Sequence, residues 1–359
     1  MPLPIALDYR PALLSRAGIG RATRELAGAL ARLDDVDVHL FGHSLARARV
    51  AAAATGRARL HRAPIPGRSL GLLRRVGIGA ERLAGGAALF HWTDYVQPPV
   101  RAAKAVLTVH DLAFVRDASW HGADAAALQE RTRRAIAAAD ALVCPTQATA
   151  DDVAGFAPDA PDPHVVPWGS DHVPTRALPR PRDGHYALCV GTIEPRKNHL
   201  ALIRAWRSLP ARRPHLVVVG AVGWACDDAT AALRAAERDG VLTWRRDVDD
   251  QQLWALLQHA RLVAYPALWE GFGLPVLEAM ASGVPVVAHD VDPLREVGGD
   301  AAHYADATSH EALTDALERA LFDDELRARC KRLGTARARD FSWRRCAEAH
   351  AALYREVVG

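Results

Sequence analysis

The stretch at residues 264–290 reads AYPALWEGFGLPVLEAMASGVPVVAHD, and it decides the fold of this chain. It places an apolar strand, a glycine turn between two glutamates, a short helix and a second strand in immediate succession. Pro275 has the fixed φ of a helix start and Gly283 stands where a left-handed cap would end the helix, so we expect about two helical turns. The turn at 270–273 precedes the helix N-terminus, where unpaired N–H groups favour an anion. Taken alone, the turn is better interpreted as a tight connection with two solvated glutamates.

The length and composition indicate a globular protein with two domains. A chain of 359 residues suits two domains of about 150 to 200 residues each. The sequence has no apolar run long enough to span a membrane, and its start, MPLPIALDYRP, lacks the pattern of an export signal. We therefore expect a cytoplasmic protein. The cysteines lack metal or redox spacing and are expected to be buried and reduced.

An arginine-rich segment occupies residues 46–90, which hold nine arginines and a single acid, Glu81. Interleaved apolar residues make it weakly amphipathic, a pattern suited to the inner membrane surface or to an anionic acceptor. A solvated arginine-rich face explains the pattern equally well. Nucleic acid is disfavoured as a partner, because no aromatic residue interleaves these arginines.

Short apolar runs alternate with helical stretches along the whole chain, which indicates parallel sheets covered on both faces. We expect strands at 5–7, 36–41, 88–91, 105–110, 141–144 and 164–167, and then at 186–190, 215–219, 242–244, 262–265 and 285–288. A proline-rich linker at 174–184 separates the predicted domains, 1–175 and 176–340. The amphipathic helix predicted at 341–359 closes the second domain or crosses back to the first. The predicted fold is two doubly wound, Rossmann-like α/β domains that face each other across a cleft.

A basic loop, GTIEPRKNH at residues 191–199, follows the strand that ends at Val190. Arg196 and Lys197 form a plausible clamp for a diphosphate, with bidentate contacts from the guanidinium and a point charge from the ammonium. A solvated basic pair is the alternative. It is disfavoured because cations are destabilising at the positive end of a helix dipole.

These motifs together resemble the nucleotide-sugar signature of glycosyltransferase family 4, whose members are retaining enzymes of the GT-B fold. The resemblance rests on GTIEPRKNH followed by EGFGLPVLEAMASGVPVVA, and extends to GIGRATREL, TVHDLAF, VVPWGSD, VVVGAVGW and GGDAAHYAD. It covers nearly the whole chain and is strongest to bacterial GDP-mannose-type transferases. It implies metal-independent transfer of a hexose, mannose from GDP-mannose, onto a lipid-linked or nascent surface polysaccharide, with no cofactor beyond the nucleotide-sugar donor.

The resemblance also assigns roles to individual residues. Arg196 and Lys197 would neutralise the leaving diphosphate, Glu270 would bind sugar hydroxyls, and Glu278, taken to lie in the first helical turn, would bind the ribose. The other residues implied at the donor are Gly18, Gly20, Arg21, Gly191, Asp247, Val248, Gly271, Phe272, Gly273 and Leu274. His110 would point at the sugar near the reacting carbon, although it could equally be a satisfied core histidine.

We expect alanine at Arg196 or Lys197 to abolish turnover and to leave the melting temperature close to that of the wild type, because exposed cations contribute little to stability.

Three competing motifs are weaker. Residues 247–250, DVDD, resemble a metal-binding motif of the other major glycosyltransferase fold but read better as a helix N-cap, so no metal site is expected. Residues 18–23 form an incomplete dinucleotide fingerprint, which makes a dehydrogenase a weak hypothesis. The paired glutamates give little support to a glycoside hydrolase.

Two departures from the family pattern concern the donor sugar. Trp168 replaces a small polar residue, and Leu294-Arg295 stands where a serine is usual. A non-catalytic nucleotide-sugar-binding protein and a nucleotide-sugar epimerase of the same fold remain as alternative functions.

Overall fold

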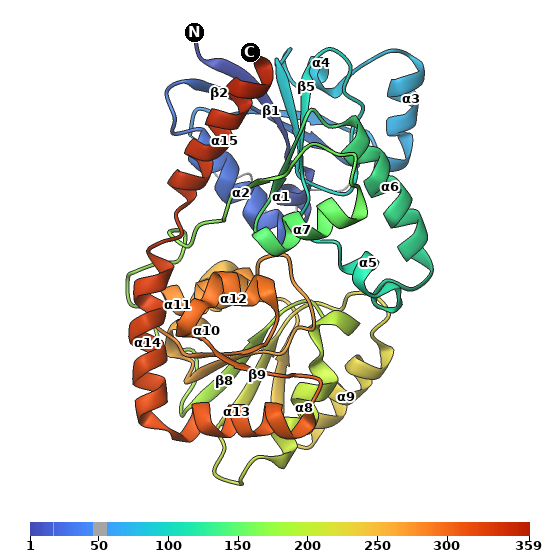
Figure 1. Ribbon diagram of the computed structural model, residues 1–359. Coiled ribbons are helices and arrows are strands. Elements are labelled where there is room, and N and C mark those ends of the chain that lie inside the picture. Colours follow the sequence, from blue (N-terminus) through green and yellow to red (C-terminus); the bar gives the residue numbers. More distant parts are fainter. Residues whose placement is uncertain (17, 46–55) are drawn as a thin grey trace. The chain divides into compact units, whose positions relative to one another are not determined.

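A computed structural model describes residues 1–16, 18–45 and 56–359 and divides the chain into two compact units (Figure 1). Unit 1 comprises Met1–Val115, Ala126–Gly169 and Ser342–Gly359. Unit 2 comprises Arg116–Ala125 and Ser170–Phe341. The chain therefore passes from unit 1 to unit 2 after Gly169, ahead of the linker expected at 174–184, and a short segment of the first half belongs to unit 2.

Unit 1 is built on a parallel sheet with the strand order β3-β2-β1-β4-β5-β6-β7. Its strands are β1 (Leu3–Asp8), β2 (Val36–His43), β3 (Arg59–Ala63), β4 (Leu89–Trp92), β5 (Lys104–Thr108), β6 (Ala141–Cys144) and β7 (His164–Val165). Its helices are α1 (Arg10–Leu14), α2 (Ile19–Leu30), α3 (Leu70–Arg75), α4 (Ala80–Leu83), α5 (Ala113–Arg116), α6 (Ala125–Ala138), α7 (Gln147–Phe156) and α15 (Trp343–Val358).

Alternation along the strands gives this sheet two buried faces. Ile5 and Leu7 of β1 pack with α2 and α15, whereas Ala6 joins a second core with α4, α6 and α7. Burial on both faces of the sheet explains why these strands are almost continuously apolar in the sequence. The final helix, α15, packs against α2 in unit 1. There Tyr354 makes a buried hydrogen bond of 2.7 Å with Nδ1 of His91.

Unit 2 repeats the architecture with the order β10-β9-β8-β11-β12-β13, also fully parallel. Its strands are β8 (Tyr186–Val190), β9 (His215–Val219), β10 (Leu242–Arg245), β11 (Leu262–Tyr265), β12 (Val286–His289) and β13 (His303–Ala305). Its helices are α8 (His199–Ser208), α9 (Asp227–Arg238), α10 (Asp250–His259), α11 (Leu274–Ala281), α12 (Asp292–Gly298), α13 (His310–Phe322) and α14 (Asp324–Ala338). The predicted pair of doubly wound α/β domains is thereby confirmed.

Two edge strands were not predicted. β3 lies inside the arginine-rich segment, where β2 is its only partner among the described residues, and it is partly exposed. In the same described part of the chain, β13 pairs with β12 alone. An edge strand with polar residues has little of the apolar signal that marks a central one.

The arginine-rich segment is only partly covered by the structure, because residues 46–55 lie outside the described part. On α3, Leu70 is buried, whereas Leu72 is 60% exposed. Val76, just beyond the helix, is 59% exposed. All five cysteines are buried, and none of them forms a disulfide within the part of the chain that the structure describes. Within the described part of the chain, no helix is both long and apolar enough to cross a membrane.

Candidate functional site

The candidate site lies where the strand order of unit 2 changes direction. β8 and β11 are neighbours, but the chain leaves them toward opposite edges of the sheet. Ligands of open α/β sheets bind outside the carboxyl ends of the strands at this point. The loop after β8 carries Arg196 and Lys197 in a 3₁₀ turn, Pro195–Lys197, and the loop after β11 carries Glu270.

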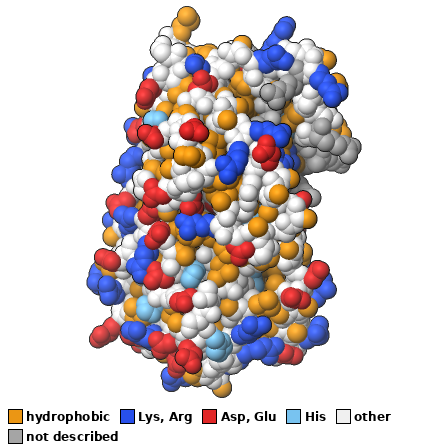
Figure 2. All heavy atoms as spheres, turned by 45° about the vertical axis from the view of Figure 1, so that its right-hand side comes forward, with side chains coloured by type: hydrophobic (Ala, Val, Ile, Leu, Met, Phe, Trp, Pro, Cys, Tyr) orange, Lys and Arg blue, Asp and Glu red, His pale blue; other side chains and the backbone are white. Residues whose placement is uncertain are grey.

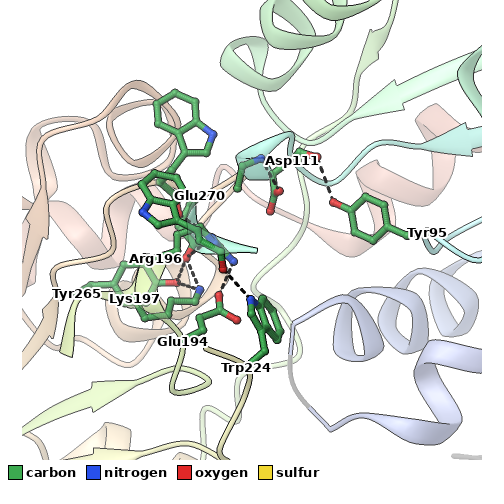
Figure 3. A network of polar contacts seen from close by, with 11 residues as sticks. Tyr95, Asp111, Glu194, Arg196, Lys197, Trp224, Tyr265 and Glu270 are labelled. Atoms are coloured by element: carbon green, nitrogen blue, oxygen red, sulfur yellow. Dashed lines mark hydrogen bonds and ion pairs between the residues drawn. The ribbon is translucent and has the colours of Figure 1, made fainter. Parts of the chain in front are cut away.

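Arg196 joins the two loops (Figure 3). Its guanidinium donates to the carbonyl of Trp269 at 2.6 Å and lies 3.0 Å from Oε1 of Glu270. Its other terminal nitrogen pairs with Glu194 at 2.8 Å. The side chain is only 11% exposed, so Arg196 is fixed between two buried carboxylates.

Lys197 reaches the same oxygen of Glu270 from the other side (Figure 3). Its ammonium also lies 3.2 Å from the hydroxyl of Tyr265, which in turn donates to Glu270 at 2.9 Å. The Lys197 side chain is 13% exposed. The expectation that these cations are exposed is therefore wrong, because both neutralise a carboxylate that would otherwise be buried as an uncompensated charge.

The cluster keeps Glu270 ionised. Burial opposes ionisation, but Arg196, Lys197 and the hydrogen bond from Tyr265 outweigh it and lower the pKa of Glu270 to about 2. Burial and the charge of Glu270 raise the pKa of Tyr265 well above its ordinary value, so this hydroxyl stays protonated and donates. A carboxylate with this pKa cannot act as a general acid near neutral pH.

The glycine turn leads directly into α11, as predicted. Gly273 has φ +84°, and a Cβ there would lie 2.4 Å from a methyl group of Leu294. Glycine is therefore required both by the backbone conformation and by the packing of α12. Gly271 adjoins Glu270 in the turn, Phe272 is buried, and Leu274 is the first residue of α11. Gly283, with φ +70°, follows the end of the helix as expected.

Glu278 lies in the second turn of α11, not in the first as expected. Only 2% exposed, it is 3.0 Å from Nε2 of His172. The imidazole of His172 packs edge-on against Trp254. Glu278 thus lies on the helix that follows the glycine turn. Its carboxylate is held by His172, a residue that the sequence analysis did not single out.

The remaining predicted residues of unit 2 surround these elements. Gly191 is the first residue after β8, and its Cα faces the aliphatic part of Lys197. Asp247 is exposed and Val248 half-buried, in the loop between β10 and α10. Asp249 forms a capping box with Gln252, so the predicted N-cap at DVDD is confirmed. The described residues hold no group of three or more potential metal ligands.

Three of the residues predicted in unit 1 lie together at the start of α2. Gly18 precedes α2 and Arg21 is buried within it. Gly20 packs against α1, where a Cβ would lie 2.3 Å from the carbonyl oxygen of Ser15. Gly20 therefore has a packing role whatever else it does.

His110 is buried just beyond β5. Its Nε2 is 2.9 Å from the carbonyl oxygen of Thr93, and its Nδ1 has no hydrogen-bond partner in the described structure. Burial lowers its pKa, so the imidazole is neutral at pH 7. Trp168, one of the departures from the family pattern, packs edge-on against this ring at 5.6 Å. The departure thus changes the surroundings of His110.

Sequence reasoning overlooked several residues at the site. Glu194 and Tyr265 lie within the quoted motifs, but their partnership with the cations depends on contacts between two loops. The segment Arg116–Ala125 was assigned to the first domain, yet the Arg116 guanidinium stacks on Trp269 at 3.7 Å, next to Glu270. In the same segment, the carbonyl of Trp120 accepts a hydrogen bond of 2.8 Å from Trp224. No local sequence pattern predicts such contacts between segments that are far apart in the chain.

Comparisons with known proteins agree on both halves of the chain. Residues 16–174 match the family model described as Glycosyltransferase Family 4, and residues 175–337 match the model described as Glycosyl transferases group 1. The O-antigen chain mannosyltransferase B of Escherichia coli is 31% identical over 280 residues, which cover 72% of this chain and 74% of that protein. The D-inositol 3-phosphate glycosyltransferase of Xylanimonas cellulosilytica is 32% identical over 277 residues, covering 70% and 66%. The fold is similar to that of sucrose-phosphate synthase from Thermosynechococcus elongatus, with a TM-score of 0.79, 21% identity and 99% of both chains covered.

Proposed function

Because this chain belongs to glycosyltransferase family 4, we propose that it transfers a hexose, with retention of configuration, from a nucleoside-diphosphate sugar to a glycan acceptor. The proposed donor is GDP-mannose. It is supported by the relative named O-antigen chain mannosyltransferase B. The proposed acceptor is a lipid-linked or nascent surface polysaccharide, and the protein would act in the cytoplasm, at the inner face of the membrane.

The observation that supports this proposal most is the ion cluster at the ends of β8 and β11. Arg196 and Lys197 meet on the carboxylate of Glu270 there, and Arg196 also pairs with Glu194, so two neighbouring cations are held at the strand ends with two carboxylates as their partners. A donor diphosphate would take the place of Glu270 as their partner. During transfer, the bond between the sugar and the diphosphate breaks while the acceptor oxygen bonds to the anomeric carbon, and the acceptor proton passes to the leaving phosphate. Arg196 and Lys197 would stabilise the charge that grows on that phosphate.

The two glutamates would then have separate tasks. Glu270, released from the cations, would accept hydrogen bonds from the sugar hydroxyls. Glu278, buried beside His172, would accept them from the ribose. The backbone N–H groups from Gly271 to Leu274 would support the sugar and diphosphate, because a helix N-terminus favours negative charge.

We propose that no metal ion is required, because the two cations supply the positive charge at the diphosphate. Activity that is unchanged by EDTA would support this point. Activity that is lost in EDTA and restored by Mg²⁺ or Mn²⁺ would contradict it.

The alternatives are distinguished by a product assay with radiolabelled GDP-mannose. A transferase releases GDP, moves label to an acceptor or to water, and loses this activity in Lys197→Ala. An epimerase yields a new nucleotide sugar without releasing GDP. A protein that binds the donor and converts none of it would be a non-catalytic binding protein. Calorimetric titration with GDP, UDP and ADP tests the choice of base, and tighter binding of UDP than of GDP would overturn it.

A further inference from the structure

Unit 1 holds a cavity of 1330 Å³ at the point where its own strand order changes direction. That point lies between β1 and β4. Arg10 follows the end of β1, Trp92 ends β4, and the loop 96–101 continues from β4, and all of them line the cavity. The remaining walls come from the 3₁₀ turn η1 (Gly67–Ser69) with the start of α3, and from α6. This is the place where open α/β sheets bind ligands.

The charged side chains that line the cavity are mostly basic. The basic ones are Arg10, Arg101, Arg131 and Arg134, and the acidic one is Glu130. Glu130 pairs with Arg134 at 2.7 Å, but both side chains are exposed, so this pair is weak. Arg131 is exposed, and its side chain makes no hydrogen bond or ion pair with any residue that the structure describes. The cavity therefore has a surplus of positive charge.

The basic residues of α6 are arranged along one side of the helix. Ala127, Arg131, Arg134 and Ala138 recur at helical spacing and all line the cavity. The alanines leave room between the helix and the facing loop, and the arginines can reach a ligand placed there. The side of the molecule that carries α3 and α6 is on the right in Figure 1. It is turned forward in Figure 2, where basic side chains stand next to exposed apolar ones.

The opposite wall is apolar and held in place. It includes Leu70, Val96, Pro98 and Pro99. The indole of Trp92 donates to the carbonyl of Pro98 at 2.9 Å, which fixes the proline pair against the sheet. Arg10 is fixed as well, because Asp94 accepts its hydrogen bond at 2.6 Å.

We infer that this cavity binds an organic phosphate, with the phosphate at the arginines of α6 and its organic part along the apolar wall. Guanidinium groups match phosphate oxygens in pairs, and two of them on one helix face can hold one group. The cavity is larger than the 300–1,000 Å³ typical of sites for drug-sized molecules, so a bulky ester fits. Within the proposed function, this ligand is the phosphate-bearing end of the acceptor. That role rests on the proposed function, whereas the binding itself does not.

The test uses a double variant, Arg131→Gln with Arg134→Gln. Its matched control is Arg32→Gln with Arg57→Gln, which removes the same charge from exposed positions of unit 1 outside the cavity. All titrations contain saturating GDP, so that the donor site is filled. One arm measures binding of glucose 1-phosphate by calorimetry. The other measures co-sedimentation with phosphatidylcholine vesicles that contain or lack a polyprenyl phosphate.

We expect the wild type and the control to bind, and the cavity variant to bind at least about tenfold more weakly. Binding of glucose 1-phosphate alone identifies a soluble phosphate ester, and binding of the polyprenyl vesicles identifies a lipid-borne one. Equal binding by the cavity variant and the control overturns the inference, as does the absence of wild-type binding in both arms. An unchanged melting temperature and GDP affinity show that the variant is folded. The proposed function is tested separately from phosphate binding. It fails if the wild-type protein binds the phosphate but transfers no sugar.

Discussion

At the scale of single residues, the donor-side cations are part of a buried charge network. Arg196 lies between Glu194 and Glu270, and removing it leaves both carboxylates short of a positive partner. We therefore expect Arg196→Ala to abolish turnover and also to reduce the free energy of unfolding by about 3 kcal/mol, the usual cost of breaking a buried pair. Urea denaturation measures this loss.

The control for that experiment is Arg207→Ala. Arg207 pairs with Asp239 at the surface of unit 2, where both side chains are about half exposed. Its removal should change the free energy of unfolding by less than about 1 kcal/mol. Equal stability of the two variants would mean that the Arg196 cluster contributes no more than a surface pair does.

Glu270 gives a second prediction, on the dependence of stability on pH. Its pKa falls from 4.5 in the unfolded chain to about 2 in the folded one. Its stabilising effect is fully present above pH 4.5 and is lost as the pH falls toward 2. The full effect is on the order of 3 kcal/mol. We expect the stability difference between wild type and Glu270→Gln to be constant from pH 8 to 5 and to shrink below 4.5, in urea titrations at each pH. A difference that changes between pH 6 and 8 would show that Glu270 titrates near neutrality.

The sequence singled out the two cations and the two glutamates of this cluster, but not how they are linked. The adjacent cations and the glutamate each lie in a recognisable local motif, because each motif depends on a strand that leads into a glycine-containing loop. The ion pairs between them depend on β8 and β11 being neighbours in the sheet, which is a property of topology. For this reason Glu194, Tyr265 and His172 were missed, and both cations were taken to be exposed.

At the scale of elements, the start of α11 depends on a glycine that serves two purposes. In Gly273→Ala the new Cβ would meet Leu294, and the backbone would be held in a left-handed conformation that costs about 1–2 kcal/mol for an alanine. We expect a loss of more than about 2 kcal/mol in the free energy of unfolding, and weaker GDP binding, because the turn must shift.

Two further variants separate the causes. Leu294→Ala, combined with Gly273→Ala, removes the clash and should recover GDP affinity in part, since only the backbone strain then remains. Gly28→Ala is the control, because Gly28 lies inside α2 with open space around it, and alanine there should stabilise by about 0.5–1 kcal/mol. If Gly273→Ala proved as harmless as this control, the turn would not require a glycine.

Central elements were predicted better than edge elements, for a physical reason. β8, β9 and β11 are buried on both faces, so their apolar runs stand out in the sequence. β3 and β13 are edge strands of the sheets that the structure describes, so they need less apolar surface. In β3 the pairing is aided by an ion pair between Arg59 and Asp37 at 2.8 Å, which no hydrophobic pattern reveals.

At the scale of the whole molecule, each unit has its own hydrophobic core, although the chain crosses between the units more than once. α15, at the C-terminal end, belongs to the core of unit 1, and Arg116–Ala125 belongs to unit 2. The alternation of strands and helices revealed two domains. It could not show which domain received these two segments, because the amphipathic face of a helix does not identify its partner.

The separate cores lead to a prediction about thermal unfolding. The ion cluster, the glycine turn and Glu278 all belong to unit 2, so GDP should stabilise that unit in particular. At a concentration about 100 times its dissociation constant, a ligand adds about 2.7 kcal/mol, which raises the melting temperature of a domain of this size by roughly 5–10 °C. In scanning calorimetry of the wild type we expect two transitions, and we expect GDP to shift only one of them. In Lys197→Ala we expect GDP to shift neither transition. A GDP shift of both transitions in the wild type would instead mean that unit 1 binds the nucleotide as well, the role predicted for Gly18, Gly20 and Arg21.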